Sequence, residues 1–158
     1  MNNLKREIES KWDGNLTFKN ENINFTRAYT FNKAIKQSNT ELVFICDADM
    51  SLPTNIVELL NKYISTKSSW FPISFHLDKN GENGKYKTEG KGIFATTKTQ
   101  LKEVGFFNEE FTSWGDEDWE IFFRFYKNGI RPHRTWEQFL IHNYHESKRP
   151  EGYKSIYE

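Results

Sequence analysis

The sequence is poor in cysteine, has no excess of charge of either sign and contains no long apolar run. Cys46 is the only cysteine among 158 residues, so an internal disulfide is excluded and a reducing compartment is expected. Basic and acidic residues both number 22, so net charge gives no indication of a nucleic-acid or membrane partner. The charged residues 1–10 do not resemble a signal peptide, and no segment is long and apolar enough to cross a bilayer. We therefore expect a cytoplasmic protein with no transmembrane segment and no nucleic-acid partner.

Aromatic residues are abundant instead, at 16% of the chain. Such a content is typical of a well-filled core, although aromatic rings also form platforms for sugars. The length suits one domain, and the sequence shows neither an internal repeat nor a linker. We therefore expect a single domain over residues 1–158, whose oligomeric state the sequence does not indicate.

Apolar periodicity predicts an α/β fold in which helices and strands alternate. Helices are predicted over residues 4–12, 26–37, 53–64, 97–104 and 114–128, and strands over residues 42–46, 70–77, 92–96 and 136–143. The run Leu42–Cys46 is continuous rather than alternating, which favours a strand covered on both faces. Ser113 is the expected N-cap of the 114–128 helix. The polar segment Asp78–Gly90 holds three glycines and is expected to be a mobile loop.

Two aspartates, Asp47 and Asp49, follow the predicted strand at 42–46 directly. Residues i and i+2 of a strand point to the same side, so both carboxylates are expected to face one ligand at the strand's carboxyl end. Ligands bind at this edge of open α/β sheets, and carboxylate oxygens there suit Mg²⁺ or Mn²⁺. The alternative interpretation is a solvated turn in which one aspartate caps the following segment.

A second acidic cluster, Asp116-Glu117-Asp118, lies at the start of a predicted helix between Trp114 and Trp119. The helix dipole and the unpaired N–H groups of a first turn favour acidic residues, so an ordinary helix start is one interpretation. Aromatic rings beside carboxylates are also a common way to hold a sugar, so a carbohydrate site is the other.

Two histidines, His142 and His145, lie near the end of the last predicted strand. Imidazole is the commonest side-chain ligand of transition metals, although histidines on an ordinary surface are the alternative interpretation. An aspartate pair combined with a histidine would form a mixed site suited to Mn²⁺.

Together these motifs resemble the GT-A glycosyltransferases, most closely the β-1,4-galactosyltransferase family and its relatives among bacterial capsule and chondroitin-type enzymes. The segments that carry the resemblance are Phe25-Thr26-Arg27-Ala28 with Asn32, Asp47-Ala48-Asp49, Val104–Phe111, Trp114-Gly115-Asp116-Glu117-Asp118, Ile130-Arg131-Pro132 and Ile141–His145. They are similar to the family's F-N-R-A…N segment, its D-x-D, the stretch leading into its W-G-G-E-D motif, that motif itself and its closing segment. Thr26 stands where the family has Asn, and Asp116 where it has Gly.

The resemblance implies a GT-A-like, Rossmann-related mixed sheet flanked by helices, in a chain that begins after the family's first strand-helix-strand unit. It implies inverting transfer of a hexose, galactose or N-acetylgalactosamine, from a UDP-sugar donor to a hydroxyl of a saccharide acceptor. The alternatives are a truncated homologue that binds carbohydrate or a partner without catalysis, and a metal-dependent phosphoester hydrolase.

The resemblance also implies a role for each site residue. Asp49 with His142 or His145 would hold Mn²⁺ or Mg²⁺, and Asp118 would be the catalytic base. Phe25, Arg27 and Asp47 would bind the nucleotide-sugar, and Trp114, Gly115 and Glu117 the acceptor.

Overall fold

The computed structural model describes residues 6, 9–10, 14–18, 26–112, 115–146 and 155. Most of the helix predicted over residues 4–12 lies outside this range, as do Phe25, Ser113 and Trp114. The expectation that the family's first strand-helix-strand unit is absent from this chain stays a prediction. No described helix is long and apolar enough to span a membrane.

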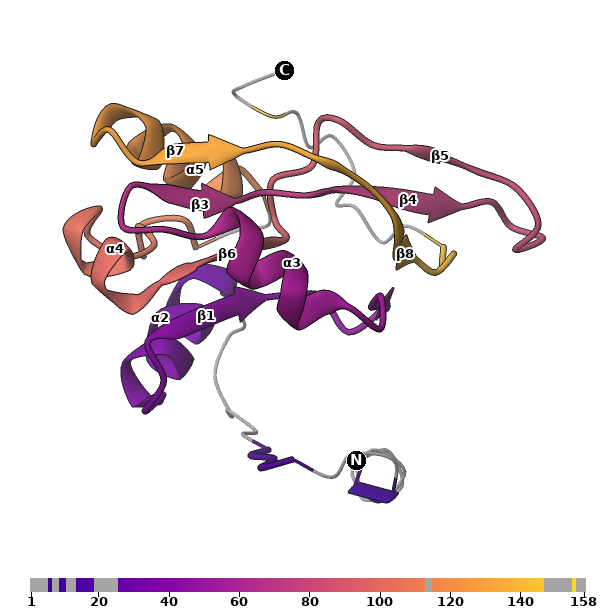
Figure 1. The fold of residues 1–158 in the computed structure, drawn as a ribbon, viewed down its shortest axis with the longest axis horizontal. Helices are drawn as coiled ribbons and strands as arrows, with labels where there is room; N and C mark the ends of the chain where they lie inside the picture. Colours follow the sequence, from indigo (N-terminus) through magenta and orange to yellow (C-terminus); the bar gives the residue numbers. More distant parts are fainter. Residues whose placement is uncertain are drawn as a thin grey trace.

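The described chain is a mixture of helices and short strands (Figure 1). The helices are α2 (Arg27–Gln37), α3 (Ile56–Tyr63), α4 (Lys98–Glu103) and α5 (Glu117–Lys127). The strands are β1 (Leu42–Ile45), β2 (Met50–Ser51), β3 (Ser68–Trp70), β4 (Ile73–Leu77), β5 (Gly84–Tyr86), β6 (Phe94–Thr97), β7 (Arg131–His133) and β8 (Trp136–His142).

The strands form two four-stranded sheets, in the orders β1-β6-β3-β7 and β2-β8-β4-β5. Both are mixed, because β3 pairs with β7 and β4 with β8 in parallel while the other pairs are antiparallel. Main-chain hydrogen bonds from Phe71 N to His133 O (2.8 Å) and from Ile73 N to Thr135 O (2.7 Å) continue the parallel ladder from one sheet into the next. The predicted α/β architecture with mixed sheets and flanking helices is thus confirmed.

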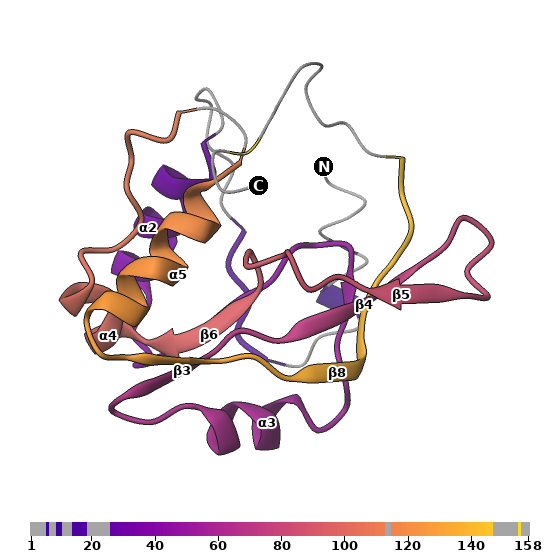
Figure 2. The same cartoon turned by 90° about the horizontal axis from the view of Figure 1, so that it is seen from above.

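The first sheet is covered on both faces: α2, α4 and α5 lie on one side and α3 on the other (Figure 2). Neighbouring strand residues point to opposite faces, so Ile45 packs with the larger core and Phe44 with the α3 side. The buried residues of the larger core are Ala28, Ile35, Ile45, Phe71, Phe94, Leu101, Val104, Phe107, Ile121, Phe125 and Ile130. The prediction of a strand covered on both faces therefore holds at its carboxyl end, whereas Leu42 is exposed.

Several predicted boundaries are wrong. The strand predicted over 70–77 is interrupted at Phe71-Pro72, where proline has no N–H to give to a ladder. The loop predicted over 78–90 contains β5, which pairs with β4, and β7 was not predicted. Helix α5 begins at Glu117 rather than at residue 114, because Gly115 and Asp116 both have positive φ, at 98° and 70°.

Candidate active site

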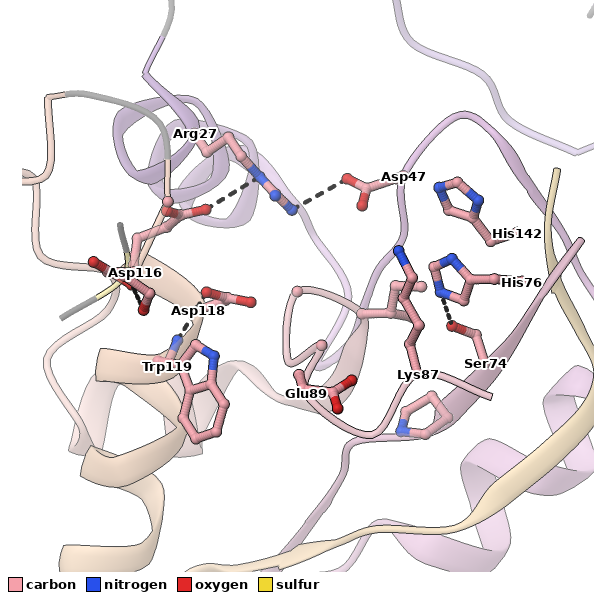
Figure 3. A pocket seen from close by; sticks show the side chains of 17 residues that line it. Arg27, Asp47, Ser74, His76, Lys87, Glu89, Asp116, Asp118, Trp119 and His142 are labelled. Atoms are coloured by element: carbon pink, nitrogen blue, oxygen red, sulfur yellow. Dashed lines mark hydrogen bonds and ion pairs between the residues drawn. The ribbon is translucent and has the colours of Figure 1, made fainter. Parts of the chain in front are cut away.

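A cleft of about 460 Å³ opens beside the N-terminal ends of α2 and α5 (Figure 3). Its charged and imidazole side chains come from six parts of the chain and are Arg27, Asp47, His76, Lys87, Glu89, Asp116, Glu117, Asp118 and His142. Gly115 and Trp119 also line it, whereas Trp114 lies outside the described residues. The acidic clusters at 47 and at 116–118, distant in sequence, therefore face one cavity.

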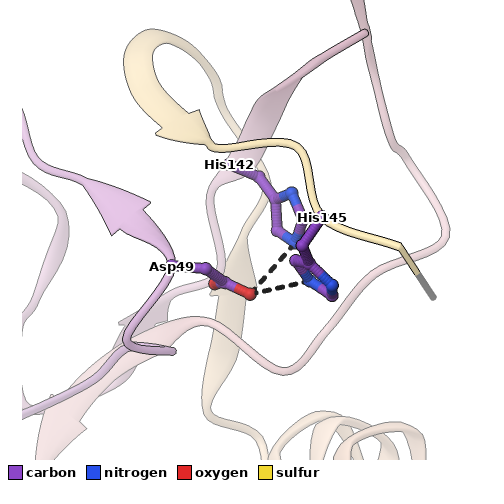
Figure 4. Close-up of side chains that lie close together, drawn as sticks. All are labelled: Asp49, His142 and His145. Carbon is purple, nitrogen blue, oxygen red and sulfur yellow. Dashed lines mark ion pairs between the residues drawn. The ribbon is translucent and has the colours of Figure 1, made fainter. Parts of the chain in front are cut away.

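Asp49, His142 and His145 form a triangle of possible metal ligands at the edge of the second sheet (Figure 4). Asp49 Oδ2 lies 3.4 Å from His142 Nε2 and 3.0 Å from His145 Nε2. The three ligand atoms all lie within 4.8 Å of one another. Met50 pairs with His142 across β2 and β8, and Asn143 donates from its main chain to Asp49 O (2.9 Å). The pairing of β2 with β8 thus brings the turn at Asp49 to both histidines.

The donor set of this triangle fits a divalent cation. Asp49 Oδ1 is buried and accepts no hydrogen bond from the described residues, although a buried carboxylate oxygen normally has a partner. One carboxylate and two imidazoles suit Mn²⁺, and more weakly Mg²⁺, which prefers oxygen ligands. The sequence left open which histidine would serve, and the geometry places both within reach.

His76 is a site residue that sequence reasoning missed. It lies opposite His142 in the β4–β8 ladder, and the two rings stack with centroids 4.2 Å apart. Its Nε2 shares a hydrogen bond with Ser74 Oγ (3.1 Å). Burial, and next the neighbouring His142, lower the pKa of His76 to about 4. A neutral ring at neutral pH can therefore pack against His142 without repelling a cation at the triangle.

Arg27 joins the two acidic clusters. Its Nη2 lies 3.1 Å from Asp47 Oδ1, and its Nε lies 3.3 Å from Glu117 Oε1. The strand predicted to orient Asp47 and Asp49 to the same side ends at Ile45, so neither aspartate lies on it, and the expectation that both face one ligand stays a prediction. Asp47 turns to Arg27 and Asp49 to the histidines.

Glu117 is almost fully buried, with 2% of its surface exposed. Burial raises its pKa, while the Arg27 guanidinium opposes that rise. Its Oε2 has no hydrogen-bond partner among the described residues, although the side chain lines the cleft. A bound hydroxyl is the kind of donor that this oxygen lacks.

Asp118 lies in the first turn of α5 and faces the same cleft. Its Oδ1 accepts from Trp119 N (2.9 Å), and its Oδ2 accepts from Lys91 N at the longer distance of 3.3 Å. Two main-chain donors therefore orient a carboxylate that remains open to the cavity.

A second cleft of about 650 Å³ adjoins the metal-ligand triangle on the side of the β4–β5 hairpin. It shares His76, Lys87 and His142 with the first cleft and adds Lys79, Lys85, Tyr144 and His145. The lysines of this hairpin were not singled out from the sequence, because no motif marks them. They make this side of the triangle basic.

Other polar residues of the motifs are structural. Asn32 is buried on α2, where its side chain donates to Phe107 O and accepts from Phe107 N, both at 2.9 Å. It therefore fastens the chain after α4 to α2 rather than facing the cleft.

Comparison with known proteins gives consistent matches. A family model described as the N-terminal domain of galactosyltransferase matches residues 72–149. The chain is 32% identical over 117 residues to N-acetyl-beta-glucosaminyl-glycoprotein 4-beta-N-acetylgalactosaminyltransferase 1 of Mus musculus, covering 70% of this chain and 11% of that protein. It is 24% identical over 140 residues to chondroitin sulfate synthase 3 of Mus musculus, covering 77% of this chain and 16% of that protein. The chain thus spans less than a fifth of each relative's length.

Proposed function

We propose that this chain, whose predicted relationship to the galactosyltransferases is confirmed by these matches, performs metal-dependent hexosyl transfer. The donor would be a UDP-sugar, with galactose or N-acetylgalactosamine as the sugar, and the acceptor a saccharide hydroxyl. The observation that carries the proposal is that His142, one corner of the metal-ligand triangle, lines the same cleft as Asp118. A leaving-group site and a base would then lie on one cavity.

Asp49, His142 and His145 would hold the cation, which supplies charge stabilisation for the departing diphosphate. The lysines of the β4–β5 hairpin add positive charge beside the triangle, on the side of the second cleft. An anionic diphosphate is therefore favoured there by both the ion and the hairpin.

Asp118 would accept the proton of the acceptor hydroxyl, a contribution typically of about 10²–10⁴-fold in rate. Glu117 would receive a hydrogen bond from another acceptor hydroxyl at Oε2, which has no partner among the residues that the structure describes. Trp119 gives the acceptor an aromatic surface in the same cleft. Arg27 fixes Asp47 and Glu117 relative to each other. Its guanidinium would contact the UDP-sugar between these two carboxylates.

The test combines donor binding and turnover. Calorimetry should show UDP binding that requires Mn²⁺, and UDP-galactose or UDP-N-acetylgalactosamine should be consumed with a saccharide acceptor. Asp118→Asn should lower kcat by about 10²-fold or more while UDP binding persists. Glu58→Gln is the matched control, since Glu58 is an exposed acid in the first turn of α3.

A wild-type rate of sugar transfer by Asp118→Asn would show that Asp118 is not the base. UDP binding of equal affinity with and without Mn²⁺ would show that the metal site is not part of the donor site. Mn²⁺-dependent binding of UDP without transfer from any donor would instead indicate a carbohydrate-binding homologue without catalysis.

A further inference from the structure

Residues 88–92 form a fixed wall of the first cleft, in the segment where the sequence predicted a mobile loop. Glu89, Gly90 and Gly92 all line the cavity. The carbonyl oxygens of Thr88, Glu89 and Gly90 point to two cations that come from different places in the chain. The wall is therefore held by side chains rather than by a strand ladder.

The first cation, Lys91, belongs to the wall itself and is only 6% exposed. Its ammonium donates to Thr88 O (2.9 Å) and Glu89 O (3.0 Å). It also lies 4.1 Å from the ring centre of Trp119 and 5.4 Å from that of Phe122. Lys91 thus joins the wall to α5, the helix that carries Asp118.

The second cation, Arg134, lies between β7 and β8. One guanidinium nitrogen, Nη2, donates to Thr88 O (2.6 Å), and the other, Nη1, donates to Gly90 O (3.0 Å) and Phe71 O (3.1 Å). Arg134 therefore fastens the wall to the point where the two sheets meet.

Neither cation forms an ion pair with a carboxylate of the described residues. A half-buried guanidinium and a buried ammonium are costly without such a partner, and their hydrogen bonds go instead to the three consecutive carbonyls of the wall and, from Arg134, also to Phe71 O. The arrangement indicates that the exact position of the wall matters.

The wall also reaches the proposed base directly. Lys91 N donates to Asp118 Oδ2. A Cβ at Gly92 would lie 3.6 Å from the same oxygen and 3.1 Å from Arg27 Nη2, so the main chain passes close to both side chains. A shift of residues 88–92 would therefore move the donor that orients Asp118.

We propose that Lys91 and Arg134 are positioning residues that hold residues 88–92 against Asp118 and so set the geometry of proton removal. The proposal rests on the proposed function, because it acts through Asp118. Neither residue belongs to the motifs from which that function was predicted.

The test uses substitutions that keep the packing. Lys91→Met preserves the length and the contact with Trp119 but removes the donor, whereas Lys91→Arg can still donate to both carbonyls and stack on the ring. Since a displacement of about 1 Å at a reacting group can cost about 10²-fold, we expect kcat of Lys91→Met to fall about 10–100-fold with the KM for the donor little changed. Lys91→Arg should recover most of this loss.

Arg134→Lys keeps the charge but cannot span Thr88 O, Gly90 O and Phe71 O, so it should also lose kcat. Lys62→Met is the matched lysine control, because Lys62 lies over Tyr63 (4.8 Å to the ring centre) at an exposed position of α3. Arg131→Lys, at an exposed position of β7, is the arginine control.

Hydrogen exchange gives a readout that does not need turnover. The amide of residue 91, which donates to Asp118 Oδ2, should exchange faster in Lys91→Met than in the wild type and return to the wild-type rate in Lys91→Arg. Unchanged exchange or unchanged kcat in Lys91→Met would overturn the proposal, and an equal loss in Lys91→Arg would assign Lys91 to packing alone. If the wild type transfers no sugar at all, the proposed function fails, and the exchange rates still decide whether the two cations hold the wall.

Discussion

Removal of one carboxylate should remove most of the stabilisation that Mn²⁺ gives to this protein. The perturbation is Asp49→Asn, which keeps the size of the side chain and removes its charge. In the wild type a cation would find Asp49 Oδ2 within 3.4 Å of both imidazole Nε2 atoms, and a second carboxylate oxygen that is buried with no hydrogen-bond partner in the described part of the chain. The folded chain should therefore bind Mn²⁺ far better than the unfolded chain, in which these three residues are apart.

The size of the effect follows from mass action. At a free Mn²⁺ concentration of about 100 times Kd, binding stabilises the fold by about 2.7 kcal/mol. For a domain of this size each kcal/mol raises Tm by about 2–4 °C, so we expect a rise of about 5–10 °C. Supporting groups of a metal site are worth about 10–100-fold in affinity, and a direct ligand should be worth at least the upper value. With Kd raised about 100-fold, the same Mn²⁺ concentration gives about 0.4 kcal/mol and a shift of about 1 °C.

The assay is thermal unfolding of wild type, Asp49→Asn and Asp47→Asn over a series of Mn²⁺ concentrations. Asp47→Asn is the matched control, because Asp47 belongs to the same D-x-D but pairs with Arg27 outside the triangle. The reasoning is refuted if Asp49→Asn keeps the full shift, or if Asp47→Asn loses as much as Asp49→Asn. A shift that survives in both His142→Ala and His145→Ala would likewise remove the histidines from the site.

Two further outcomes test the cleft and its wall. Gly92→Ala should lower turnover, because the new methyl would lie 3.1 Å from Arg27 Nη2 and would displace the guanidinium that pairs with Asp47 and Glu117; turnover equal to wild type would contradict this close approach. Burial lowers the pKa of Lys91 from 10.5 to about 8, so between these pH values the unfolded chain binds the proton that the folded chain has lost. The free energy of unfolding should then rise with pH in this window, relative to Lys91→Met, by at most about 3 kcal/mol, less where Trp119 stabilises the ammonium. Urea unfolding of both proteins across the window checks this, and parallel curves would show that Lys91 titrates normally.

Local pattern in the sequence was enough to predict most elements of the fold. The helix 26–37 matches α2, and the strand 92–96 matches β6 to within two residues at either end. These segments have clear apolar periodicity and ends marked by ordinary signals, as at Thr97, whose side chain caps α4 in a capping box with Gln100. Where the chain adopts positive φ at a residue other than glycine, as at Asp116, no local signal exists and the predicted helix start was wrong.

The site was predictable only to the extent that its residues belong to motifs. Asp49, His142 and Asp118 were found in this way, although their assigned roles stay predictions. His76 was not found, because only the parallel pairing of β4 with β8 places it on His142, and pairing between distant strands leaves no trace in a single sequence. Lys91 and Arg134 were missed for the same reason, since their carbonyl partners are set by tertiary structure.

The separation between metal site and base is set by three connections that do not depend on one another. Pairing of β2 with β8 holds Asp49 to the histidines, and Arg27 ties the chain after β1 to Glu117 at the start of α5. Lys91 and Arg134 hold the opposite wall to the same helix and to the junction of the sheets. Because transfer requires the leaving group and the attacking hydroxyl to be held at a fixed distance, a fault in the second or the third connection should reduce kcat more than donor binding, whereas a fault in the first should also weaken donor binding through the metal. Arg27→Lys, which cannot span both carboxylates, should therefore resemble Arg134→Lys in its kinetics, and a change confined to donor KM would show that Arg27 serves the nucleotide alone.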